Sequence, residues 1–579
     1  MNEPMFWAWW GWEPLRFYHY MKGQAAGVTG LAQECLDDWY EQLHSEDVAK
    51  AAAELGINWA VTHFVKGFGL DYEKEEIART AALTSICHRY GIKVFGYLQY
   101  GTILHETFFQ ECPQAKDWIQ LDEAGAPQLW CGSPLRFLPC IHADEHHQYL
   151  RECIRRGLQD IGLDGLHFDN FYSRPCYCPR CRQEFRAYAN AEIPPESALA
   201  NEPHHDPVVR QWIRFRCDRL ASLMEEISRF ARAIKPDVKL IWNPSPIRGT
   251  LNQAALRGTD FRQLGPRAGI LWSESGNFPG CRDGRLIHQV NFFKTAEAIG
   301  YQTFSTTWMR GAEGLGLPQT AAEIALNTAE SAAFGAVPGS NWLLRPSHLH
   351  DLLSQGPLSC ELKRNLDFIR RHADVFVGSQ GDGEVTLFLD QESPAWEFSR
   401  SYGAFLAVQE LLLRRHVTFD LVFSESAARR RPERLVLRIS SRRLHDGISD
   451  SARVLDISGA LGPASVSGSY QAAVAMTPEM EQESERIIAA LGQREVTVSA
   501  PETVFVEARR TADQRRVLHC LNYDNQSAPA RVSVAFLTPP AEVQALSPDR
   551  EAVRLIPSHG RIELPPVATW AVLVWNDQA

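Results

Sequence analysis

The chain has 579 residues, a formal net charge of −11 and 45% hydrophobic residues. This length allows two to four domains, each with its own core, and the acidic balance without a long basic run argues against a nucleic-acid-binding protein. No stretch reaches the roughly 18 apolar residues of a membrane span, and the first residues lack the basic and apolar pattern of a secretion signal. We therefore expect a cytoplasmic protein without nucleic-acid or membrane partners.

Up to about residue 345, predicted strands alternate with predicted helices. The strands are short apolar segments at 6–12, 56–63, 93–100, 165–169, 239–243, 269–274, 301–306 and 337–344. Helical periodicity and helix start signals lie between them, at 33–44, 45–55, 73–90, 142–162, 210–234, 288–298 and 320–334. Eight such alternations predict an α/β fold, a (β/α)8 TIM barrel that forms a catalytic domain over residues 1–375.

Two smaller units are predicted after the barrel. Residues 376–495 read as a shorter run of alternating strands and helices without a glycine-rich phosphate loop. This pattern predicts a flavodoxin-like α/β domain with a structural or oligomerisation role. Residues 496–579 contain short alternating runs separated by turn residues, which predict a small C-terminal antiparallel β-sandwich.

The fourth predicted strand ends in a carboxylate. In the run 165–169, Leu166 and Phe168 share one face, and His167 and Asp169 share the other. A barrel strand with apolar residues towards the helices and a carboxylate at its carboxyl end opens onto an active site. Asp169 is therefore the first catalytic candidate.

Glu274, at the end of the sixth strand, is the second catalytic candidate. It has the same parity as Trp272, so it would face Asp169 across the barrel mouth. Hydrolysis of a glycosidic bond needs such a pair, one ionised group at the anomeric carbon and one acid for the leaving oxygen. The alternative is that Glu274 caps a helix or pairs with Arg267 or Arg282.

Polar and aromatic residues at the other strand ends are predicted to bind substrate, since this rim of a barrel carries the binding loops. Each is weak evidence alone, because a single histidine or tryptophan more often has a structural role. Together they predict a polar site with tryptophan walls that suits a monosaccharide. The candidates are Glu13, His63, Lys66, Tyr100, His167, Asn243, Trp272, Trp308, Trp342 and Arg345.

Cys176, Cys178 and Cys181 follow the fourth strand with metal-ligand spacing. The odd total of 13 cysteines fits reduced thiols with one metal site better than a disulfide framework. Either Cys140 or Cys131 would complete a tetrahedral zinc site, and we prefer Cys140, because it lies just before the helix that leads into this strand. A closed four-cysteine zinc site is structural. The alternative is four free thiols.

Three segments of the predicted barrel, 61–70, 91–97 and 164–169, resemble the α-L-fucosidases of glycoside hydrolase family 29. In that family the aspartate of strand four is the nucleophile of a retaining mechanism, and a histidine after strand two binds the sugar. The resemblance therefore implies that Asp169 is the nucleophile and that His63 is a sugar ligand.

The cysteine cluster and the two later domains are similar to the β-galactosidases of family 42, whose middle domain mediates trimerisation. That family has Asn-Glu at the end of strand four, whereas Asp169-Asn170 is followed here by Phe171. The combination resembles the uncharacterised "hypothetical glycosyl hydrolase" proteins over most of the chain. It implies a carbohydrate substrate and a homo-oligomer, either a trimer or a dimer.

The sequence thus predicts a retaining exo-glycosidase with Asp169 as nucleophile and Glu274 as acid/base. Its substrate would carry a terminal, α-linked sugar similar to fucose or galactose. One alternative is a β-galactosidase-like enzyme with a different acid/base. The other is a catalytically silent carbohydrate-binding or assembly protein.

Overall fold

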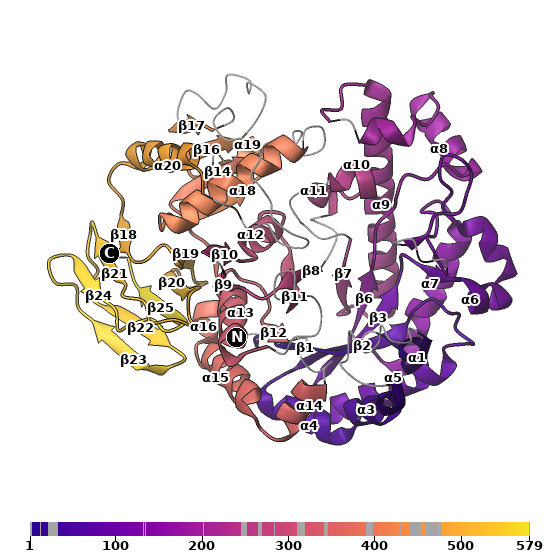
Figure 1. The fold of residues 1–579 in the computed structure, drawn as a ribbon, viewed down its shortest axis with the longest axis horizontal. Coiled ribbons are helices and arrows are strands. Elements are labelled where there is room, and N and C mark those ends of the chain that lie inside the picture. Colours follow the sequence, from indigo (N-terminus) through magenta and orange to yellow (C-terminus); the bar gives the residue numbers. More distant parts are fainter. Residues whose placement is uncertain are drawn as a thin grey trace.

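The computed structural model describes most of the chain between residues 3 and 577. The residues outside the description are 1–2, 12, 21–32, 131–132, 134, 201, 245–251, 265–268, 283, 310–318, 341–345, 390–397, 429, 440–452, 458–473, 475 and 578–579. Figure 1 shows a curled sheet surrounded by helices, with an α/β unit and a β-sandwich beside it.

The curled sheet has eight parallel strands, and each of the eight predicted strands overlaps one of them. They are β1 Trp7–Gly11, β2 Trp59–Val65, β3 Lys93–Gln99, β6 Gly165–Asp169, β7 Lys239–Trp242, β8 Ile270–Asn277, β11 Gln302–Met309 and β12 Gly339–Ser340. Their spatial order is β11-β8-β7-β6-β3-β2-β1-β12. The Val337 N–H donates to the Thr303 carbonyl at 2.7 Å, which links the segment before β12 to β11. This is the strand order of a (β/α)8 barrel.

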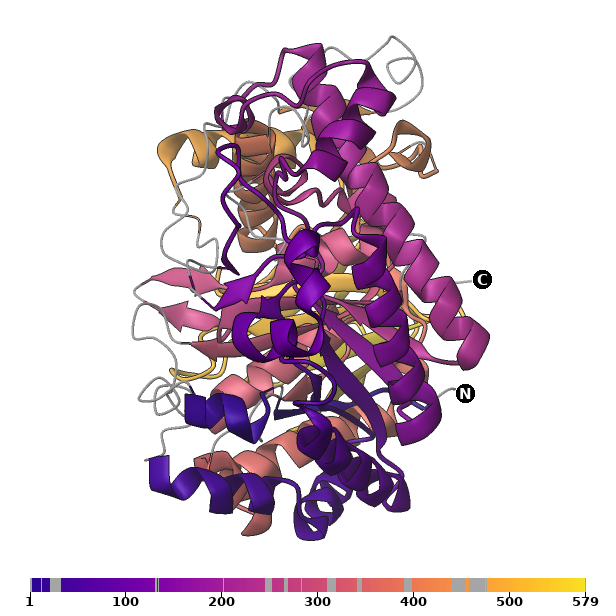
Figure 2. The same cartoon turned by 90° about the vertical axis from the view of Figure 1, so that its right-hand side faces the viewer.

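Helices lie against the outer face of this sheet, and the long helix α9 runs along one side of it (Figure 2). Ser45 caps α4 by accepting from the Val48 N–H, and Thr320 begins α13 with a capping box. The helices are α1 Leu15–Tyr20, α3 Leu36–Leu43, α4 Glu46–Leu55, α5 Lys74–Arg89, α6 His105–Glu111, α7 Asp144–Arg155, α8 Pro179–Ala189, α9 Pro207–Ile234, α10 Gln253–Arg257, α11 Phe261–Leu264, α12 Val290–Ala298, α13 Ala321–Ala333, α14 Pro346–Leu353, α15 Pro357–Arg371 and α16 Ala373–Phe376.

Aromatic side chains fill the interior of the barrel. The rings of Trp9 and Trp272 stack with their centres 5.1 Å apart, and those of Trp7 and Phe304 with their centres 4.4 Å apart. These contacts join strands that are not neighbours in the sheet, which is how a barrel buries its inward-facing residues. The interior cluster is Trp7, Trp9, Trp59, Val61, Phe95, Tyr97, Ile241, Ile270, Trp272, Phe304 and Val337.

Two insertions at the carboxyl end of the barrel form a subdomain with its own core. They follow β3 and β6, and contain the short antiparallel pair β4 Ile103–Leu104 and β5 Arg136–Phe137 together with α6 and α8. Phe108, Phe185 and Trp212 pack in this core together with the four candidate metal ligands. We call this unit the cysteine subdomain.

The chain after the barrel forms a parallel sheet. Its order is β15-β14-β16-β17, which is the order of the first four strands in a flavodoxin-like sheet. Its elements are β14 Val385–Leu389, α18 Phe398–Arg414, β15 Phe419–Val422, α19 Glu425–Ala428, β16 Leu435–Ile439, β17 Val454–Asp456 and α20 Pro478–Leu491.

The last part of the chain forms two antiparallel sheets that enclose an apolar core. The first sheet contains β13 Gln380–Gly381, β19 Val504–Arg510, β20 Arg516–Asn522, β25 Trp570–Trp575, β22 Val543–Ser547 and β23 Arg550–Leu555. The second contains β18 Val496–Ser499, β21 Ser533–Phe536 and β24 Arg561–Glu563. The strand β13 precedes the parallel sheet in the chain but pairs with β19 of the sandwich.

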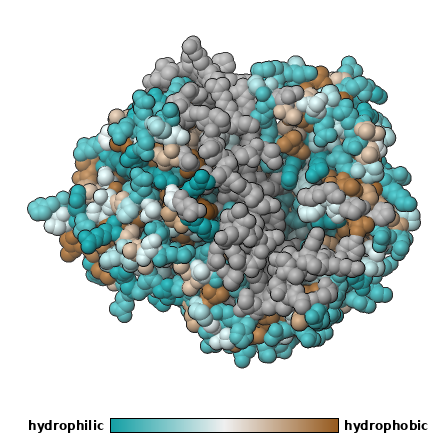
Figure 3. All heavy atoms as spheres, in the orientation of Figure 1, coloured by the Kyte–Doolittle hydropathy of each residue, from teal (hydrophilic) through white to brown (hydrophobic). Residues whose placement is uncertain are grey.

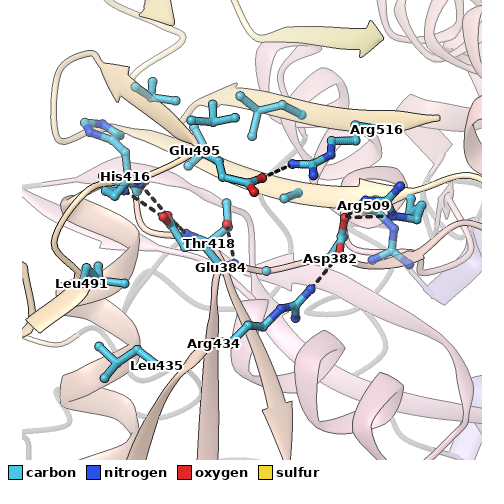
Figure 4. A pocket seen from close by; sticks show the side chains of 18 of the residues that line it. Asp382, Glu384, His416, Thr418, Arg434, Leu435, Leu491, Glu495, Arg509 and Arg516 are labelled. Carbon is cyan, nitrogen blue, oxygen red and sulfur yellow. Dashed lines mark hydrogen bonds and ion pairs between the residues drawn. The ribbon is translucent and has the colours of Figure 1, made fainter. Parts of the chain in front are cut away.

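Ion pairs connect the barrel, the parallel sheet and the sandwich. Lys294 of α12 pairs with Glu507 of β19 at 2.7 Å, and Arg509 pairs with Glu297 of α12 at 2.8 Å. Between the parallel sheet and the sandwich lies a cavity of about 260 Å³, which Figure 4 shows with its charged lining. We call the network of ion pairs between the barrel, the parallel sheet and the sandwich the junction. Its members are Lys294, Glu297, Asp382, Asp420, Arg434, Glu507, Arg509 and Arg510.

Hydrophilic side chains cover most of the described surface in the view of Figure 3, and hydrophobic ones are scattered in small groups. Among the helices that the structure describes, none combines the length and the apolar character needed to cross a membrane.

Candidate active site

Asp169 ends β6 with a carboxylate that accepts three side-chain hydrogen bonds. Its Oδ1 accepts from Asn243 Nδ2 at 2.7 Å, and its Oδ2 accepts from Asn170 Nδ2 at 2.6 Å and from the Tyr97 hydroxyl. Asp169 is buried, and its three donors come from β3, from the end of β6 and from the end of β7. The barrel therefore fixes the orientation of this carboxylate at the carboxyl ends of neighbouring strands.

Asn170 adopts a left-handed backbone conformation directly after Asp169, with φ of 51°. Such a conformation costs free energy for a non-glycine residue and is often found at functional sites. Gly101 lies so close that a Cβ on it would overlap the Asn170 backbone. The Asn170 side chain accepts from Trp130 Nε1 at 3.4 Å while donating to Asp169. The turn after β6 therefore places one amide between the carboxylate and an indole ring.

Tyr97 and Gln99 of β3 lie in register with His167 and Asp169 of β6. The Tyr97 hydroxyl lies 2.8 Å from Gln99 Oε1, as well as against Asp169. Burial raises the pKa of Tyr97 well above its ordinary value, and the charge of Asp169 raises it further. Tyr97 therefore remains a protonated donor at neutral pH.

Glu13 and Lys66 form a buried ion pair close to this carboxylate. Lys66 Nζ lies 2.7 Å from Glu13 Oε1 and 5.1 Å from the centre of the Tyr97 ring. Burial lowers the pKa of Lys66, and Glu13 opposes that shift. The residues assembled around Asp169, which we call the Asp169 cluster, are Glu13, Lys66, Tyr97, Gln99, Trp130, Arg136, Asp169, Asn170 and Asn243.

Five members of the cluster were not predicted from the sequence. Tyr97 and Gln99 could have been found by extending the alternation of β3 from Phe95, which faces the barrel interior. Asn170 was recognisable only as the neighbour of Asp169. Trp130 and Arg136 lie in the long insertion after β3, which has no periodic pattern.

Three predicted substrate residues do lie in the Asp169 cluster, namely Glu13, Lys66 and Asn243. Two others lie elsewhere. His63 is placed against Glu73, just before α5, at 3.4 Å, and the strand pairing is irregular after it. Tyr100 packs on Phe171, with ring centres 4.4 Å apart, because it has the opposite parity to Tyr97.

His167 and Trp272 face inward as predicted, but they lie within the aromatic filling of the barrel. Their ring centres are 4.5 Å apart, and both side chains are fully buried. Burial lowers the pKa of His167 to about 4, so its imidazole is neutral at physiological pH. Neither side chain hydrogen-bonds Asp169, and the structure does not bring them into the cluster.

The side chains of the remaining predicted residues are not described. The backbone of Glu274 lies in β8 opposite Thr306 of β11, but the side chains of Glu274 and Trp308 are not described. Trp342 and Arg345 lie in an undescribed segment. The assignment of the acid/base therefore stays a prediction.

Cys140, Cys176, Cys178 and Cys181 converge in the cysteine subdomain, and all four are buried. The sulfur of Cys140 lies 3.9, 3.6 and 3.5 Å from those of Cys176, Cys178 and Cys181. Four Zn–S bonds of about 2.3 Å in a tetrahedron would separate the sulfurs by roughly 3.8 Å. The cluster therefore fits a tetrahedral metal ion. Cys140 is in the place of the fourth ligand, while Cys131 lies outside the described residues.

No protein-family model matches this chain, and no curated protein matches it either. Solved structures do match over most of its length. An α-L-fucosidase, isoenzyme 2 from Paenibacillus thiaminolyticus, aligns with a TM-score of 0.65 and 14% identity, covering 92% of this chain and 96% of its own.

Two β-galactosidases are also similar. The GH42 enzyme from G. stearothermophilus has a TM-score of 0.62 and 12% identity, over 100% of this chain and 99% of that one. The enzyme from the psychrophilic Marinomonas ef1 has a TM-score of 0.58 and 13% identity, over 92% and 97%. At such identities the similarity shows the fold, and it confirms the expected resemblance to GH29 and GH42 enzymes at that level.

Proposed function

We propose that this protein is a retaining exo-glycosidase in which Asp169 attacks the anomeric carbon. The observation that carries the proposal is the Asp169 carboxylate, held by Asn243, Asn170 and Tyr97 at the carboxyl end of the fourth barrel strand. Active sites of barrel enzymes lie at this end. Such fixed donors orient a nucleophile before the substrate arrives, so less reorganisation is needed in the transition state.

In the proposed mechanism, one Asp169 oxygen forms an ester bond to the anomeric carbon while the bond to the leaving oxygen breaks. Glu274 donates a proton to that oxygen and later removes a proton from the water that hydrolyses the ester. The role of Glu274 rests on the alternation of residues along the sixth strand. Asn243 and Asn170 hold the carboxylate throughout, and Tyr97 donates to it whenever it carries charge.

We propose a terminal, α-linked sugar similar to fucose or galactose as the substrate. Carboxylates on strands four and six are commoner among α-glycosidases, and the names of the similar structures include both an α-L-fucosidase and β-galactosidases. A β-galactosidase-like enzyme with another acid/base, or a silent carbohydrate-binding protein, would share the fold.

The test is hydrolysis of a panel of 4-nitrophenyl glycosides by the wild type and by Asp169→Asn. We expect kcat to fall by about 10³-fold, the order expected when one transition-state stabiliser is lost. Asp164→Asn is a matched control, because Asp164 precedes the same strand and pairs there with His88 and Lys235. Azide should restore turnover to Asp169→Gly by replacing the missing nucleophile.

Unchanged hydrolysis by Asp169→Asn would remove this residue from its role. Absence of turnover with every glycoside would favour the silent carbohydrate-binding protein.

We also infer that the four cysteines of the cysteine subdomain bind zinc, on the basis of their sulfur separations. When bound, the ion would supply structural cross-linking, since four thiolates leave no open position for water. Elemental analysis of the purified protein should give one zinc per chain. A homo-oligomer is proposed from the resemblance to family 42, and light scattering after size-exclusion chromatography would establish whether a trimer or a dimer forms.

A further inference from the structure

Arg136, at the start of β5, is a buried guanidinium next to the candidate catalytic carboxylate. Only 8% of it is exposed. Its Nη2 donates to Thr102 Oγ1 at 3.3 Å and to Gln99 Oε1 at 3.5 Å. The Cζ of the guanidinium lies 3.8 Å from the centre of the Trp130 ring. Both acceptors are neutral and both bonds are long, while Nε is buried without an acceptor. Among the described residues, no carboxylate pairs with Arg136.

The two other deeply buried arginines of the described chain differ in their partners. Arg509 pairs with Glu297 at 2.8 Å. Arg216 donates to the carbonyls of Ala254, at 3.1 Å, and Ala255, and its Nε and Nη1 are buried without an acceptor. Like Arg136, it therefore has only neutral acceptors among the described residues.

A second buried cation, Lys66, lies near Arg136, and the carboxylates of Glu13 and Asp169 accept from other donors. Burial lowers the pKa of Lys66, and the positive charge of Arg136 lowers it further, so two cations lie close together. Glu13 pairs with Lys66 and not with Arg136. A buried cation without a counter-ion costs several kcal/mol unless an anion is supplied. A ligand can supply that anion.

Two independent chains of contacts join Arg136 to Asp169. Gln99 Oε1 lies between the Arg136 guanidinium and the Tyr97 hydroxyl, which also contacts Asp169. On the other side, the Trp130 ring stacks on Arg136, and its Nε1 donates to Asn170, whose amide donates to Asp169. The guanidinium and the carboxylate are therefore fixed relative to each other by two routes, each of which passes through two side chains.

We propose that the sugar bound at Asp169 carries a carboxylate, as a hexuronic acid does, and that Arg136 binds this carboxylate. The proposal rests on the proposed hydrolase function and names its substrate class. A guanidinium matches a carboxylate with two parallel hydrogen bonds, and stacking on Trp130 keeps its plane fixed for that contact. The substrate then supplies a charged acceptor in direct contact with Arg136, whose acceptors among the described residues are neutral.

The test compares 4-nitrophenyl glycosides that differ only at C6, galactoside with galacturonide and glucoside with glucuronide, in both anomers. We expect kcat/KM of the preferred uronide to exceed that of its neutral twin by roughly tenfold or more. Arg136→Gln should lower kcat/KM for the uronide by roughly 10- to 100-fold, the value of a lost charge-assisted contact. It should therefore lower the ratio of kcat/KM for the uronide to kcat/KM for the neutral sugar by about tenfold or more, whereas an unchanged ratio would overturn the proposal.

Two further variants act as controls. Arg136→Lys keeps the positive charge but cannot donate two parallel hydrogen bonds to a carboxylate. Its kcat/KM for the uronide should therefore lie between the values of the wild type and Arg136→Gln. Arg155→Gln removes an exposed arginine at the end of α7, which lies 6.0 Å from the ring centre of Phe230 on α9. It should leave kcat/KM for the uronide and for the neutral sugar unchanged.

Calorimetric titration of the wild type with free galacturonate and galactose needs neither turnover nor a variant. Tighter binding of galacturonate, lost in Arg136→Gln, supports the subsite, whereas equal binding of the two sugars overturns it. Asp169-dependent hydrolysis of neutral hexosides without preference for uronides overturns this inference and leaves the hydrolase intact. Absence of all turnover together with Arg136-dependent binding of galacturonate supports the subsite and overturns the hydrolase.

Discussion

The junction and the Asp169 cluster both bury charged side chains, but they balance those charges differently. At the junction, Arg434 pairs with both Asp382 and Asp420 at 2.6 Å, and Lys294 pairs with Glu507 at 2.7 Å. Each cation there faces a carboxylate from another element of the fold, as Figure 4 illustrates for the lining of its cavity. In the Asp169 cluster, Arg136 has only neutral acceptors among the residues that the structure describes.

This difference distinguishes charges that hold the protein together from charges that are arranged for a ligand. A buried pair that is internally complete needs nothing further, and breaking it leaves one charge alone. A buried group without a partner costs folding free energy that a bound ligand can return. The four cysteines also lack a partner of opposite charge, but here the protein supplies the ligands. Four thiolates converge, and a metal cation would balance their negative charge.

The largest effect is expected where the missing partner is a metal ion. Cys178→Ser should abolish metal binding and unfold the cysteine subdomain, since structural zinc contributes about 10–16 kcal/mol in small zinc domains. Elemental analysis should show loss of zinc, and limited proteolysis should cut between residues 170 and 206. Cys35→Ser is the matched control, because Cys35 is exposed and lies outside the cluster. A variant that keeps its protease resistance without metal would contradict a structural role for the ion.

The second-largest change in stability is expected when one partner of a junction ion pair is removed. Lys294→Met leaves Glu507 buried with less compensation, and we expect it to destabilise the protein by about 3–5 kcal/mol at pH 8. Differential scanning calorimetry measures the effect as a lower Tm. The double variant Lys294→Met/Glu507→Leu should recover much of the loss, because an apolar pair replaces the ionic one. Equal Tm values for Lys294→Met and the wild type would show that the junction is not held by this pair.

The barrel strands and three of the four clustered cysteines were predictable because they depend on local patterns. Alternating strands and helices are visible as periodicity, and each predicted barrel strand overlaps an observed one. The spacing of Cys176, Cys178 and Cys181 encodes a ligand loop by itself. Parity along β6 correctly placed His167 on the inner face with Asp169. The alternation of side chains predicts which face of the strand a residue occupies, but not how far inside the barrel it lies. It therefore could not predict that His167 packs among Trp9, Tyr97 and Trp272.

The residues around Asp169 were less predictable because non-local packing places them. Tyr100 was predicted to bind substrate, but it is one position beyond Gln99 and therefore lies on the opposite face. Tyr97 and Gln99 share the inner face, and Tyr100 points to the helices. Arg136 comes close to Asp169 only through the fold of a long insertion, which no periodic pattern describes. Loop residues of this kind carry function more often than strand residues, and sequence patterns locate them least well.

A smaller effect is expected from the pH dependence of the junction. Burial raises the pKa of Glu507 from 4.5 to about 7, although Lys294 and Arg509 oppose the shift. The folded state therefore binds the proton more tightly than the unfolded state. The stability from this proton is complete below about pH 4.5 and is lost as the pH rises towards 7, by at most about 3 kcal/mol. Comparison of Tm at pH 5 and pH 7.5 should show a smaller difference for Glu507→Gln than for the wild type.

The smallest expected effect is the most informative for the comparison. Arg136 and Arg509 are both more than nine-tenths buried, yet within the described part of the chain only Arg509 of these two pairs with carboxylates. Arg509→Gln should therefore lower stability by about 3 kcal/mol or more, because it leaves Glu297 and Glu507 without this cation. Arg136→Gln should change stability by less than about 1 kcal/mol, since removal of an unpaired buried charge offsets the loss of two long hydrogen bonds. Thermal unfolding of the two variants under the same conditions measures both values. If Arg136→Gln costs as much as Arg509→Gln, then Arg136 is a structural residue of the insertion, and the carboxylate of a substrate is not needed to explain its burial.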